Sequence, residues 1–450
     1  MFESVLVANR GEIAVRVIRT CQRLGIKAVG VHSEADAGAL HVRTADESVL
    51  LGPAPAAESY LDVERVLEAA LVTGAQAVHP GYGFLAENAG FARRVLDAGL
   101  AWVGPAPEAI EAMGDKVAAR NAMIAAGVPV APGTEPLADA DAAARAAAEI
   151  GYPVMVKAAA GGGGIGMAAV FDEDGLRSAY ETARTRAERF FGSPKVFLER
   201  FLPSARHVEV QVLGLADGRV VALGERDCSV QRRHQKVAEE SPSPGVTPSL
   251  RAAMLAAAVR AAEAVDYRGA GTVECLVPVD GTAEEFFFLE MNTRLQVEHP
   301  VTELVTGVDL VEEQLRVAAG EPPVLDPDAL PEPRGHAIEL RVYAEDPKRF
   351  LPGPGKITRW EEPSGEGIRV DSGYTAGDTV TPFYDPLLAK LCVWGADRPA
   401  AIERAREAVA GFAVEGPKCN LPFFAELLSE PDFVSGAYDT GLVGRMRAGR

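Results

Sequence analysis

The sequence lacks the features that would place the protein in a membrane or outside the cell. No apolar run approaches the roughly 18 residues of a transmembrane helix. The N-terminus MFESVLVANRGEI carries an early acidic residue and has no apolar core of a signal peptide. The five cysteines are scattered and form no CxxC pair, which disfavours disulfides and a thiolate metal site. We therefore expect a cytoplasmic protein.

Two common nucleotide-binding motifs are also missing. The turn ANRGEIA, which follows the first apolar run, lacks the GxGxxG pattern, and no acidic residue stands where a dinucleotide ribose needs one. No GxxxxGK[ST] P-loop occurs anywhere. These absences disfavour a nicotinamide enzyme and a P-loop NTPase.

Positive charge is scarce in this sequence. It has 45 Lys and Arg against 64 Asp and Glu, a formal net charge of -19. This balance disfavours nucleic acid and anionic membranes as partners, and an anionic ligand would need a local basic cluster. With 450 residues, 48 % of them hydrophobic, the chain predicts two or three globular domains.

The first hundred residues alternate apolar runs with helical patterns. The runs SVLVA, KAVGVHS and AQAVHP are separated by helices predicted near residues 11–24, 60–73 and 88–99. This βαβαβ order is typical of a doubly wound parallel sheet. A further helix is predicted from residue 116 to 127.

Beyond Gly151 the pattern changes to successive strands, which predicts an α+β domain. Helices near residues 174–190 and 248–265 interrupt these strands: VMVKA, VFLERFL, HVEVQVLGL, VVALGERDCSV, GTVECLVPV and EFFFLEMN. A third section begins near Pro331, after the proline-rich EPPVLDPDALPEPRG. It has predicted strands AIELRVYAED and GKITRW and a helix near residues 399–411.

The stretch PVMVKAAAGGGGIGMAAV contains four consecutive glycines behind Lys157. So many glycines in an ordered domain cost backbone entropy and need a reason. VMVKAAA and MAAV read as two strands, so the glycines would form the tip of a hairpin. We interpret this hairpin as a lid over a nucleotide rather than as a linker or a fixed phosphate cradle.

Polar side chains alternate along EEFFFLEMNTRLQVEHP, in which every second residue from Glu290 to Glu298 is polar. A half-exposed strand is one explanation, but the segment follows FFFL, and Glu274 interrupts the neighbouring apolar strand GTVECLVPV. Glu274, Glu290 and Asn292 offer the oxygen ligands that Mg²⁺ favours. Fully extended, the segment would span about 26 Å, so we expect a bend after about Arg294 that puts Arg294 and Glu298 on a loop.

Two further segments can each be interpreted either as functional or as structural. DCSVQRRHQKVAEE concentrates Arg232, Arg233, His234 and Lys236, which suits either a polyphosphate site or a charged surface. HVEVQVL puts His207, Glu209 and Gln211 on one face of a strand, where a lone histidine is more often structural than functional.

Taken together, these features resemble the biotin carboxylase family of the ATP-grasp superfamily over almost the whole chain. The carrying motifs are ANRGEIAVRVIRTC, HPGYGFLAEN, GDKVAAR, KAAAGGGGIGM, LERFLPSARHVEVQVLG, ERDCSVQRRHQKVAEESP, FLEMNTRLQVEHPVTE, AIELRVYAEDP and DSGYTAGDTVTPFYDPLLAKL. The resemblance implies a pre-ATP-grasp domain at residues 1–114, an ATP-grasp domain at 115–330 and a C-terminal domain at 331–450. The mobile glycine-hairpin lid would span about 131–203.

The resemblance also implies a nucleotide and metal site. Two ions, Mg²⁺ or Mn²⁺, would be held by Glu274, Glu290 and Asn292. ATP would be bound by Lys116, Lys157, Gly163, Gly164, Glu199, Arg200, Phe201, Leu202, His207, Gln231, His234, Glu274, Leu276 and Glu290.

For the reaction itself, the resemblance implies that carbonate attacks ATP to give carboxyphosphate, whose CO₂ is then transferred to biotin. Bicarbonate would be held by Lys236, Arg294, Gln296 and the backbone of Val297. Glu298 would be the base, Arg341 would contact the ureido oxygen of biotin, and Tyr82 would flank biotin.

No AMKM-type biotinylation motif occurs, so we expect a free-standing subunit whose biotin is a substrate on a separate carrier protein. A carboxyltransferase subunit and a homodimer are the other implied partners. An acetyl-CoA or other acyl-CoA carboxylase, as in fatty acid biosynthesis, is favoured, and a urea-type acceptor stays open. The alternatives are another ATP-grasp ligase that joins a carboxylate to an amine, and a catalytically silent nucleotide-binding subunit. Ile165 departs from the basic residue usual in the glycine loop.

Overall fold

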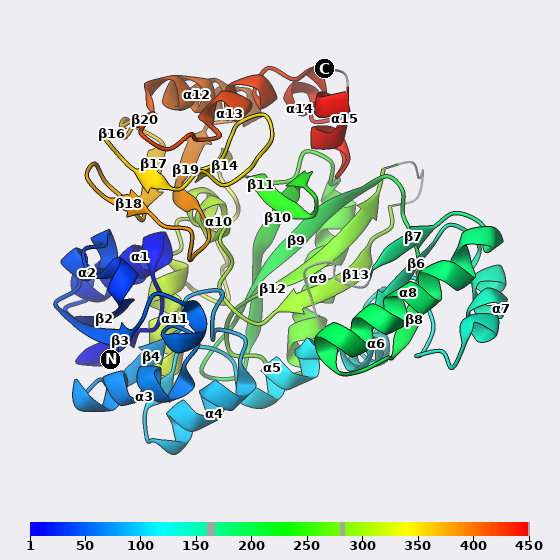
Figure 1. Cartoon of the computed structure of the whole chain (residues 1–450), viewed down its shortest axis with the longest axis horizontal. Helices are drawn as coiled ribbons and strands as arrows, with labels where there is room; N and C mark the ends of the chain where they lie inside the picture. The colour runs from blue at the N-terminus through cyan, green and yellow to red at the C-terminus, as the bar shows by residue number, and fades with distance from the viewer. Residues whose placement is uncertain (160–166, 280–283, 449–450) are drawn as a thin grey trace.

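The structure, a computed structural model, describes residues 1–159, 167–279 and 284–448. A long central sheet lies between a stacked pair of N- and C-terminal regions on one side and a small unit of sheet and helices on the other (Figure 1). Within the described residues, no helix combines the length and apolar character needed to cross a membrane.

The N-terminal region contains a five-stranded parallel sheet of order β3-β2-β1-β4-β5, as the βαβ pattern predicts. Its strands are β1 Ser4–Val7, β2 Lys27–Ser33, β3 Glu47–Gly52, β4 Ala77–His79 and β5 Ala101–Trp102. Its helices are α1 Gly11–Arg23, α2 Leu40–Thr44, α3 Val63–Val72, α4 Ala89–Asp97 and α5 Pro107–Gly114. Strand β3 was not predicted, because it is a largely exposed edge strand without a buried apolar run.

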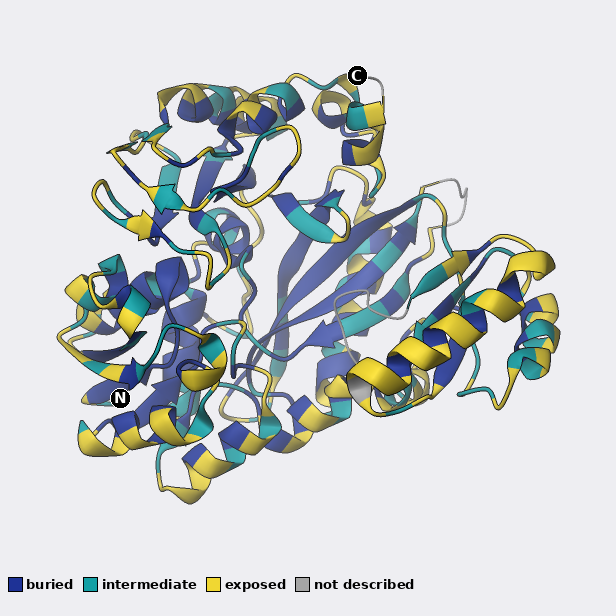
Figure 2. Ribbon diagram, in the orientation of Figure 1, coloured by how far each residue is buried: buried dark blue, intermediate teal, exposed yellow. Residues whose placement is uncertain are grey.

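The small unit follows helix α6 Lys116–Ala125. It consists of α7 Ala140–Ile150, β6 Val154–Ala158, β7 Ala168–Val170, α8 Glu173–Phe191 and β8 Val196–Arg200. Strand β6 pairs antiparallel with both β7 and β8, so the two arms of the predicted glycine hairpin do pair. The unit has its own apolar core, and α8 presents a long exposed face (Figure 2). The glycine tip and Ile165 lie outside the described residues.

The central sheet has eight antiparallel strands in the order β13-β12-β9-β10-β11-β14-β19-β17 and is buried over most of its area (Figure 2). Five strands lie before residue 331: β9 Ala205–Gly214, β10 Val220–Arg232, β11 Gln235–Ser241, β12 Gly269–Pro278 and β13 Phe287–Asn292. Three lie after it: β14 His336–Tyr343, β17 Ile368–Ser372 and β19 Leu387–Gly395. The edge of β11 is completed by β14, so the sheet crosses the boundary that composition predicts near Pro331.

Helices cover this sheet and complete the chain. They are α9 Pro248–Glu263, α10 His299–Thr306, α11 Leu310–Ala318, α12 Arg398–Gly411, α13 Leu421–Leu427, α14 Pro431–Ser435 and α15 Leu442–Ala448. Two small ladders pair β15 Gly355–Lys356 with β18 Thr379–Val380, and β16 Arg359–Glu361 with β20 Ala413–Glu415. The predicted single strand GKITRW is therefore two short strands with different partners.

A buried carboxylate, Glu240 on β11, joins the central sheet to the C-terminal helices. Its oxygens lie 2.5 Å from His336 Nε2 and 2.6 Å from Arg398 Nε, and Tyr438 also donates to it. Burial by itself raises the pKa of Glu240, but the hydrogen bonds from His336 and Arg398 outweigh it and lower the pKa to about 2. The ionised carboxylate therefore stabilises the fold.

We expect Glu240→Gln to lower the free energy of unfolding by roughly 3 kcal/mol at pH 7. Because the folded pKa is depressed, this contribution is complete above the unfolded pKa of about 4.5 and is lost as the pH falls towards 2. Urea denaturation at pH 7, 4 and 3 measures it. Glu403→Gln, which breaks an exposed pair with Arg406, is the control and should change little. A deficit that does not depend on pH would contradict the prediction.

Candidate active site

Three glutamates stand side by side across neighbouring strands of the central sheet. Glu274 on β12 is directly opposite Glu209 on β9 and Glu290 on β13. Residues directly opposite in antiparallel strands share one face, so three carboxylates form one row. Like charges in such a row repel, and the row is stable only with cations beside it.

Lys236, from β11, supplies one of these cations. Its Nζ lies 2.6 Å from Glu209 Oε2, 2.8 Å from Glu274 Oε1 and 2.7 Å from Glu298 Oε1. Burial lowers the pKa of Lys236, but the carboxylates, Glu209 first, raise it well above its usual value. The ammonium group is therefore charged and uses all three of its donors on carboxylates.

Glu274 is the most heavily bonded member of the row. His207 Nε2 lies 2.8 Å from its Oε2, and Asn292 Nδ2 and Gln296 Nε2 donate to its Oε1 over 2.9 and 3.0 Å. Burial raises its pKa, but Lys236 and His207 lower it well below the usual range. His207 is in turn oriented by Gln231, whose Nε2 is 2.7 Å from Nδ1.

Glu290, at the end of the row, has the opposite electrostatic character. Its pKa is raised by burial and by the charge of Glu274, although Lys116 opposes this effect. A carboxylate with uncompensated negative charge, beside a second carboxylate and an amide oxygen, suits a hard divalent cation. The residues Glu274, Glu290 and Asn292 therefore fit the predicted Mg²⁺ or Mn²⁺ site in their chemistry.

Glu298 lies at the junction of β13 and α10 and is fully buried. Its Oε2 accepts from Arg341 Nη2 over 3.0 Å, and its Oε1 accepts from Lys236. Burial raises its pKa, but Lys236 and Arg341 outweigh this and hold the pKa well below its usual value. Arg341 also lies 2.6 Å from Glu239, whose pKa burial raises to about 7.

The loop before Glu298 carries Arg294 and Gln296. Strand β13 ends at Asn292, two residues before the predicted bend, and the chain turns there into α10. The Arg294 guanidinium donates to Gln296 Oε1 over 2.8 Å and to Asn292 Oδ1 over 3.1 Å. Glu87, from the N-terminal region, accepts from Arg294 Nε over 2.9 Å. The arginine therefore faces the same carboxylate row as Lys236.

Basic residues of α6 and of the small unit lie near one another. Lys157 on β6 pairs with Glu199 on β8, and Arg120 Nε is 4.0 Å from the same carboxylate. Burial lowers the pKa of Lys116; the charge of Glu290 opposes this effect, and the charge of Lys157 adds to it. Two lysines whose charges interact suit a bound polyphosphate.

Other predicted residues lie in mixed positions. The backbone N–H groups of Arg200 and Phe201 donate to the carbonyls of Pro132 and Pro153, and Leu202 follows them. Leu276 is directly opposite His207 on β9. His234 is exposed at the β10–β11 turn with φ of 67°, and it makes no side-chain hydrogen bond or ion pair with the other described residues.

Tyr82 and Val297 have partners from other regions of the chain. The Tyr82 hydroxyl donates to Glu12, and the Val297 carbonyl accepts from Lys390. Gly163 and Gly164 lie outside the described residues.

Sequence reasoning missed several residues that hold this site together. Glu209 was recognised only as a neighbour of His207 on its strand. The others come from segments far apart in the chain: Glu12, Glu87, Arg226, Glu239 and Lys390. Each lies in a motif that carries the family resemblance, but none was given a role in the site. A further signal for Lys390 is that it is a charge inside the apolar run LLAKLCV, which becomes β19.

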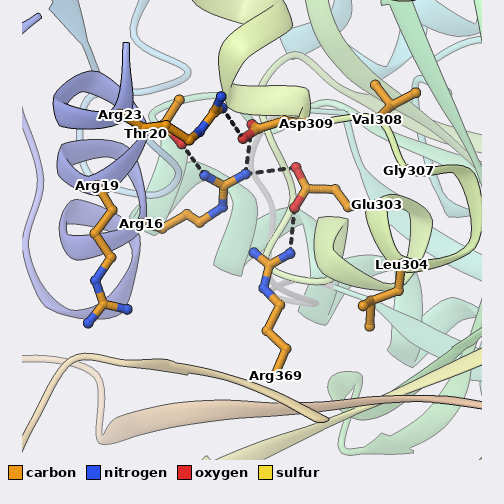
Figure 3. A pocket seen from close by; sticks show the side chains of 10 residues that line it. All are labelled: Arg16, Arg19, Thr20, Arg23, Glu303, Leu304, Gly307, Val308, Asp309 and Arg369. Carbon is orange, nitrogen blue, oxygen red and sulfur yellow. Dashed lines mark hydrogen bonds and ion pairs between the residues drawn. The ribbon is translucent and has the colours of Figure 1, made fainter. Parts of the chain in front are cut away.

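A second feature, a surface hollow of about 380 Å³, lies where the three regions meet (Figure 3). Arg16 on α1 is 2.8 Å from both Glu303 and Asp309, and Arg369 on β17 is 2.7 Å from Glu303. These ion pairs tie the N-terminal, central and C-terminal segments together. None of the predicted site residues lines the hollow.

Comparisons with known proteins agree with this geometry. Three family descriptions match in sequence: "Biotin carboxylase, N-terminal domain" at residues 1–110, "Carbamoyl-phosphate synthase L chain, ATP binding domain" at 115–324 and "Biotin carboxylase C-terminal domain" at 339–445. A biotin carboxylase of Halalkalibacterium halodurans is 53 % identical over 98 % of this chain and 97 % of its own.

Solved structures show the same relationship. A biotin carboxylase from Campylobacter jejuni, solved as a beta-gamma-ATP complex, matches with a TM-score of 0.95 and 43 % identity over 99 % of both chains. The biotin carboxylase domain dimer of Hydrogenobacter thermophilus 2-oxoglutarate carboxylase, bound to MgADP and bicarbonate, matches with a TM-score of 0.93 and 44 % identity over 99 % of this chain and 98 % of its own. The fold and site thus define an ATP-grasp ligase. The chain belongs to the biotin carboxylase family.

Proposed function

We propose that this protein uses ATP and bicarbonate to carboxylate biotin on a separate carrier protein. The observation that carries the proposal is the continuous chain of ion pairs from Glu274 through Lys236 and Glu298 to Arg341. A ligase that joins a carboxylate to an amine needs the nucleotide and metal residues but not this extension from Glu298 to Arg341.

The nucleotide end of the site would align the phosphates of ATP. Lys116 and Lys157 would bind the phosphates, and Glu274, Glu290 and Asn292 would hold the divalent cations. When bound, these cations would neutralise the negative charge of the phosphates. Alignment and charge neutralisation are the main requirements of phosphoryl transfer.

The middle of the site would bind and deprotonate bicarbonate. Lys236, Arg294, Gln296 and the Val297 backbone would hold the anion, and Glu298 would take its proton. In the ligand-free state Lys236 and Arg341 keep the basicity of Glu298 low. A second anion that shares Lys236 and Arg294 withdraws positive charge from Glu298, so its pKa rises when the substrate is in place.

The far end of the site would act on biotin. The ring nitrogen would give its proton to the phosphate released from carboxyphosphate. Arg341 would stabilise the negative charge that then develops on the ureido oxygen, and Tyr82 would flank the ring. The partners proposed for this step are a biotin carboxyl carrier protein and a carboxyltransferase, with a homodimer as the assembly. Five free, separated cysteines support a cytoplasmic location. An acyl-CoA is the favoured final acceptor.

The proposal predicts ADP release that requires bicarbonate and increases with free biotin. Arg341→Ala should reduce the biotin-dependent increase in ADP release by about 10²-fold or more. Bicarbonate-dependent ADP release without biotin should persist at a lower rate. Coupled-enzyme assays with and without biotin measure both rates. Arg349→Ala, a change at an exposed arginine, is the control.

ADP release that ignores bicarbonate and biotin but rises with a carboxylic acid and an amine would overturn the proposal. Unchanged biotin carboxylation by the Arg341→Ala variant would overturn only the role assigned to Arg341. Absence of any turnover under all these conditions would instead favour a silent nucleotide-binding subunit.

A further inference from the structure

A buried lysine lies directly behind the loop that carries Glu298. Lys390, on β19, is fully buried, and its Nζ is 3.0 Å from Glu12 Oε2 on α1 and 3.7 Å from Asp371 Oδ2 on β17. The same Nζ donates to the carbonyl oxygen of Val297 over 3.0 Å. One ammonium group therefore joins the N-terminal region, the C-terminal strands and the loop of the active site.

The burial of this lysine needs compensation. An ammonium group without water costs several kcal/mol unless carboxylates pair with it. Burial lowers the pKa of Lys390, but Glu12 and the other buried carboxylates outweigh this and raise it. If Lys390 only connected the regions of the chain, its ion pairs would be sufficient. Its hydrogen bond to the Val297 carbonyl indicates a second role, because this carbonyl is a backbone group of the active-site loop.

The position of that carbonyl explains what the bond can control. The Val297 carbonyl belongs to the peptide group that links Val297 to Glu298, so its orientation sets the backbone angles from which the Glu298 side chain departs. The backbone bonds recorded around this turn, from His299 N–H to Gln296 and from Val301 N–H to Glu298, are both long at 3.3 Å. The bond from Lys390 is shorter and comes from a rigid, buried strand.

We propose that Lys390 is a positioning residue for the reaction: its ammonium group fixes the Val297–Glu298 peptide and so holds the Glu298 carboxylate against Lys236. The Glu12 partner also accepts from Tyr82, which links the same lysine to the predicted biotin side of the site. The inference rests on the proposed function, since it assigns this positioning to the deprotonation of bicarbonate.

The outer ion pairs at the same junction provide a matched control. Arg369, on β17, reaches Glu303 on α10 over 2.7 Å and borders the hollow in Figure 3. Like Lys390, it connects the C-terminal strands to the segment that contains Glu298. Arg369 also pairs with Asp371, a neighbour of Lys390, but within the described residues it makes no hydrogen bond to Val297. Its removal therefore weakens the junction and leaves the bond from Lys390 to Val297 in place.

The test compares Lys390→Met with Arg369→Gln. For Lys390→Met we expect kcat for bicarbonate-dependent ADP release to fall by about 10- to 100-fold and KM for bicarbonate to rise, with KM for ATP within about twofold of wild type. Amide hydrogen exchange at residues 297–301 should accelerate. Arg369→Gln should lower the stability of the protein but leave both the bicarbonate KM and the amide exchange at residues 297–301 unchanged. If the Lys390→Met variant does not fold, the double variant Glu12→Gln/Lys390→Met replaces it in the test, because it removes the buried charge together with its partner.

Unchanged bicarbonate kinetics and unchanged exchange at 297–301 in the lysine variant would overturn the inference. So would equal effects of Lys390→Met and Arg369→Gln on the bicarbonate KM. A wild-type protein without bicarbonate-dependent turnover would defeat the proposed function instead, and the exchange measurement would then still decide whether Lys390 holds the loop.

Discussion

Replacing Glu298 by glutamine is expected to lower kcat for biotin carboxylation by about 10³-fold. Glutamine keeps the size of the side chain and one oxygen acceptor but cannot take a proton. Glu298 is fully buried, and Lys236 and Arg341, which donate to its Oε1 and Oε2, are cations that cannot take the proton in its place. The binding of ATP should be little affected.

The measurement is bicarbonate-dependent ADP release at saturating ATP, together with the KM for ATP. Glu339→Gln is a matched control, because Glu339 is also a fully buried glutamate of the central sheet. Burial raises the pKa of Glu339 well above its usual value, and glutamine is nearly isosteric with the carboxyl group. Full activity of Glu298→Gln would show that the base is another group.

Replacing Lys236 by methionine is expected to damage both stability and activity. The change removes one cation from among three carboxylates that lie 2.6 to 2.8 Å from its Nζ. Breaking a buried pair leaves uncompensated charge and typically costs about 3–5 kcal/mol. The bicarbonate site also loses its central cation, so turnover should fall below detection.

The stability loss should depend on pH in a defined direction. Without Lys236, the pKa values of the buried carboxylates rise in the folded state, so the variant is most stable when they are protonated and loses stability as the pH increases. Urea denaturation at pH 5 and pH 8 measures this slope. Lys418→Met, which removes an exposed lysine paired with Asp346, is the control. A variant as stable as wild type at pH 8 would contradict the role of Lys236 as the counter-charge of the row.

Local patterns in the sequence were sufficient to predict the βαβ order at the N-terminus and five of the eight strands of the central sheet, but not β11, β17 and β19. The alternation in EMNTRLQVEH indicated Glu290 and Asn292, because side chains on a strand alternate with a period of two, and Glu274 was indicated as a charge inside the apolar strand GTVECLVPV. Strand β3 and helices α10 and α11 were missed because their patterns are short or lack a periodic apolar face.

The lateral arrangement of the site was decided by tertiary structure alone. The row of Glu209, Glu274 and Glu290 depends on the register between β9, β12 and β13, and register results from long-range pairing that no local window contains. The continuation of the sheet from β11 into β14 has the same origin. Composition and periodicity report only which face of a strand is apolar, not which strand lies beside it.

The sequence by itself determined the kind of chemistry: carboxylates, a basic cluster and a glycine hairpin, in motifs specific to one family. Only the tertiary structure decided that Lys236 neutralises three of those carboxylates and that Lys390 holds the loop behind Glu298. The physical reason is that a buried charge is stable only with partners, and its partners here come from segments that are far apart in the chain.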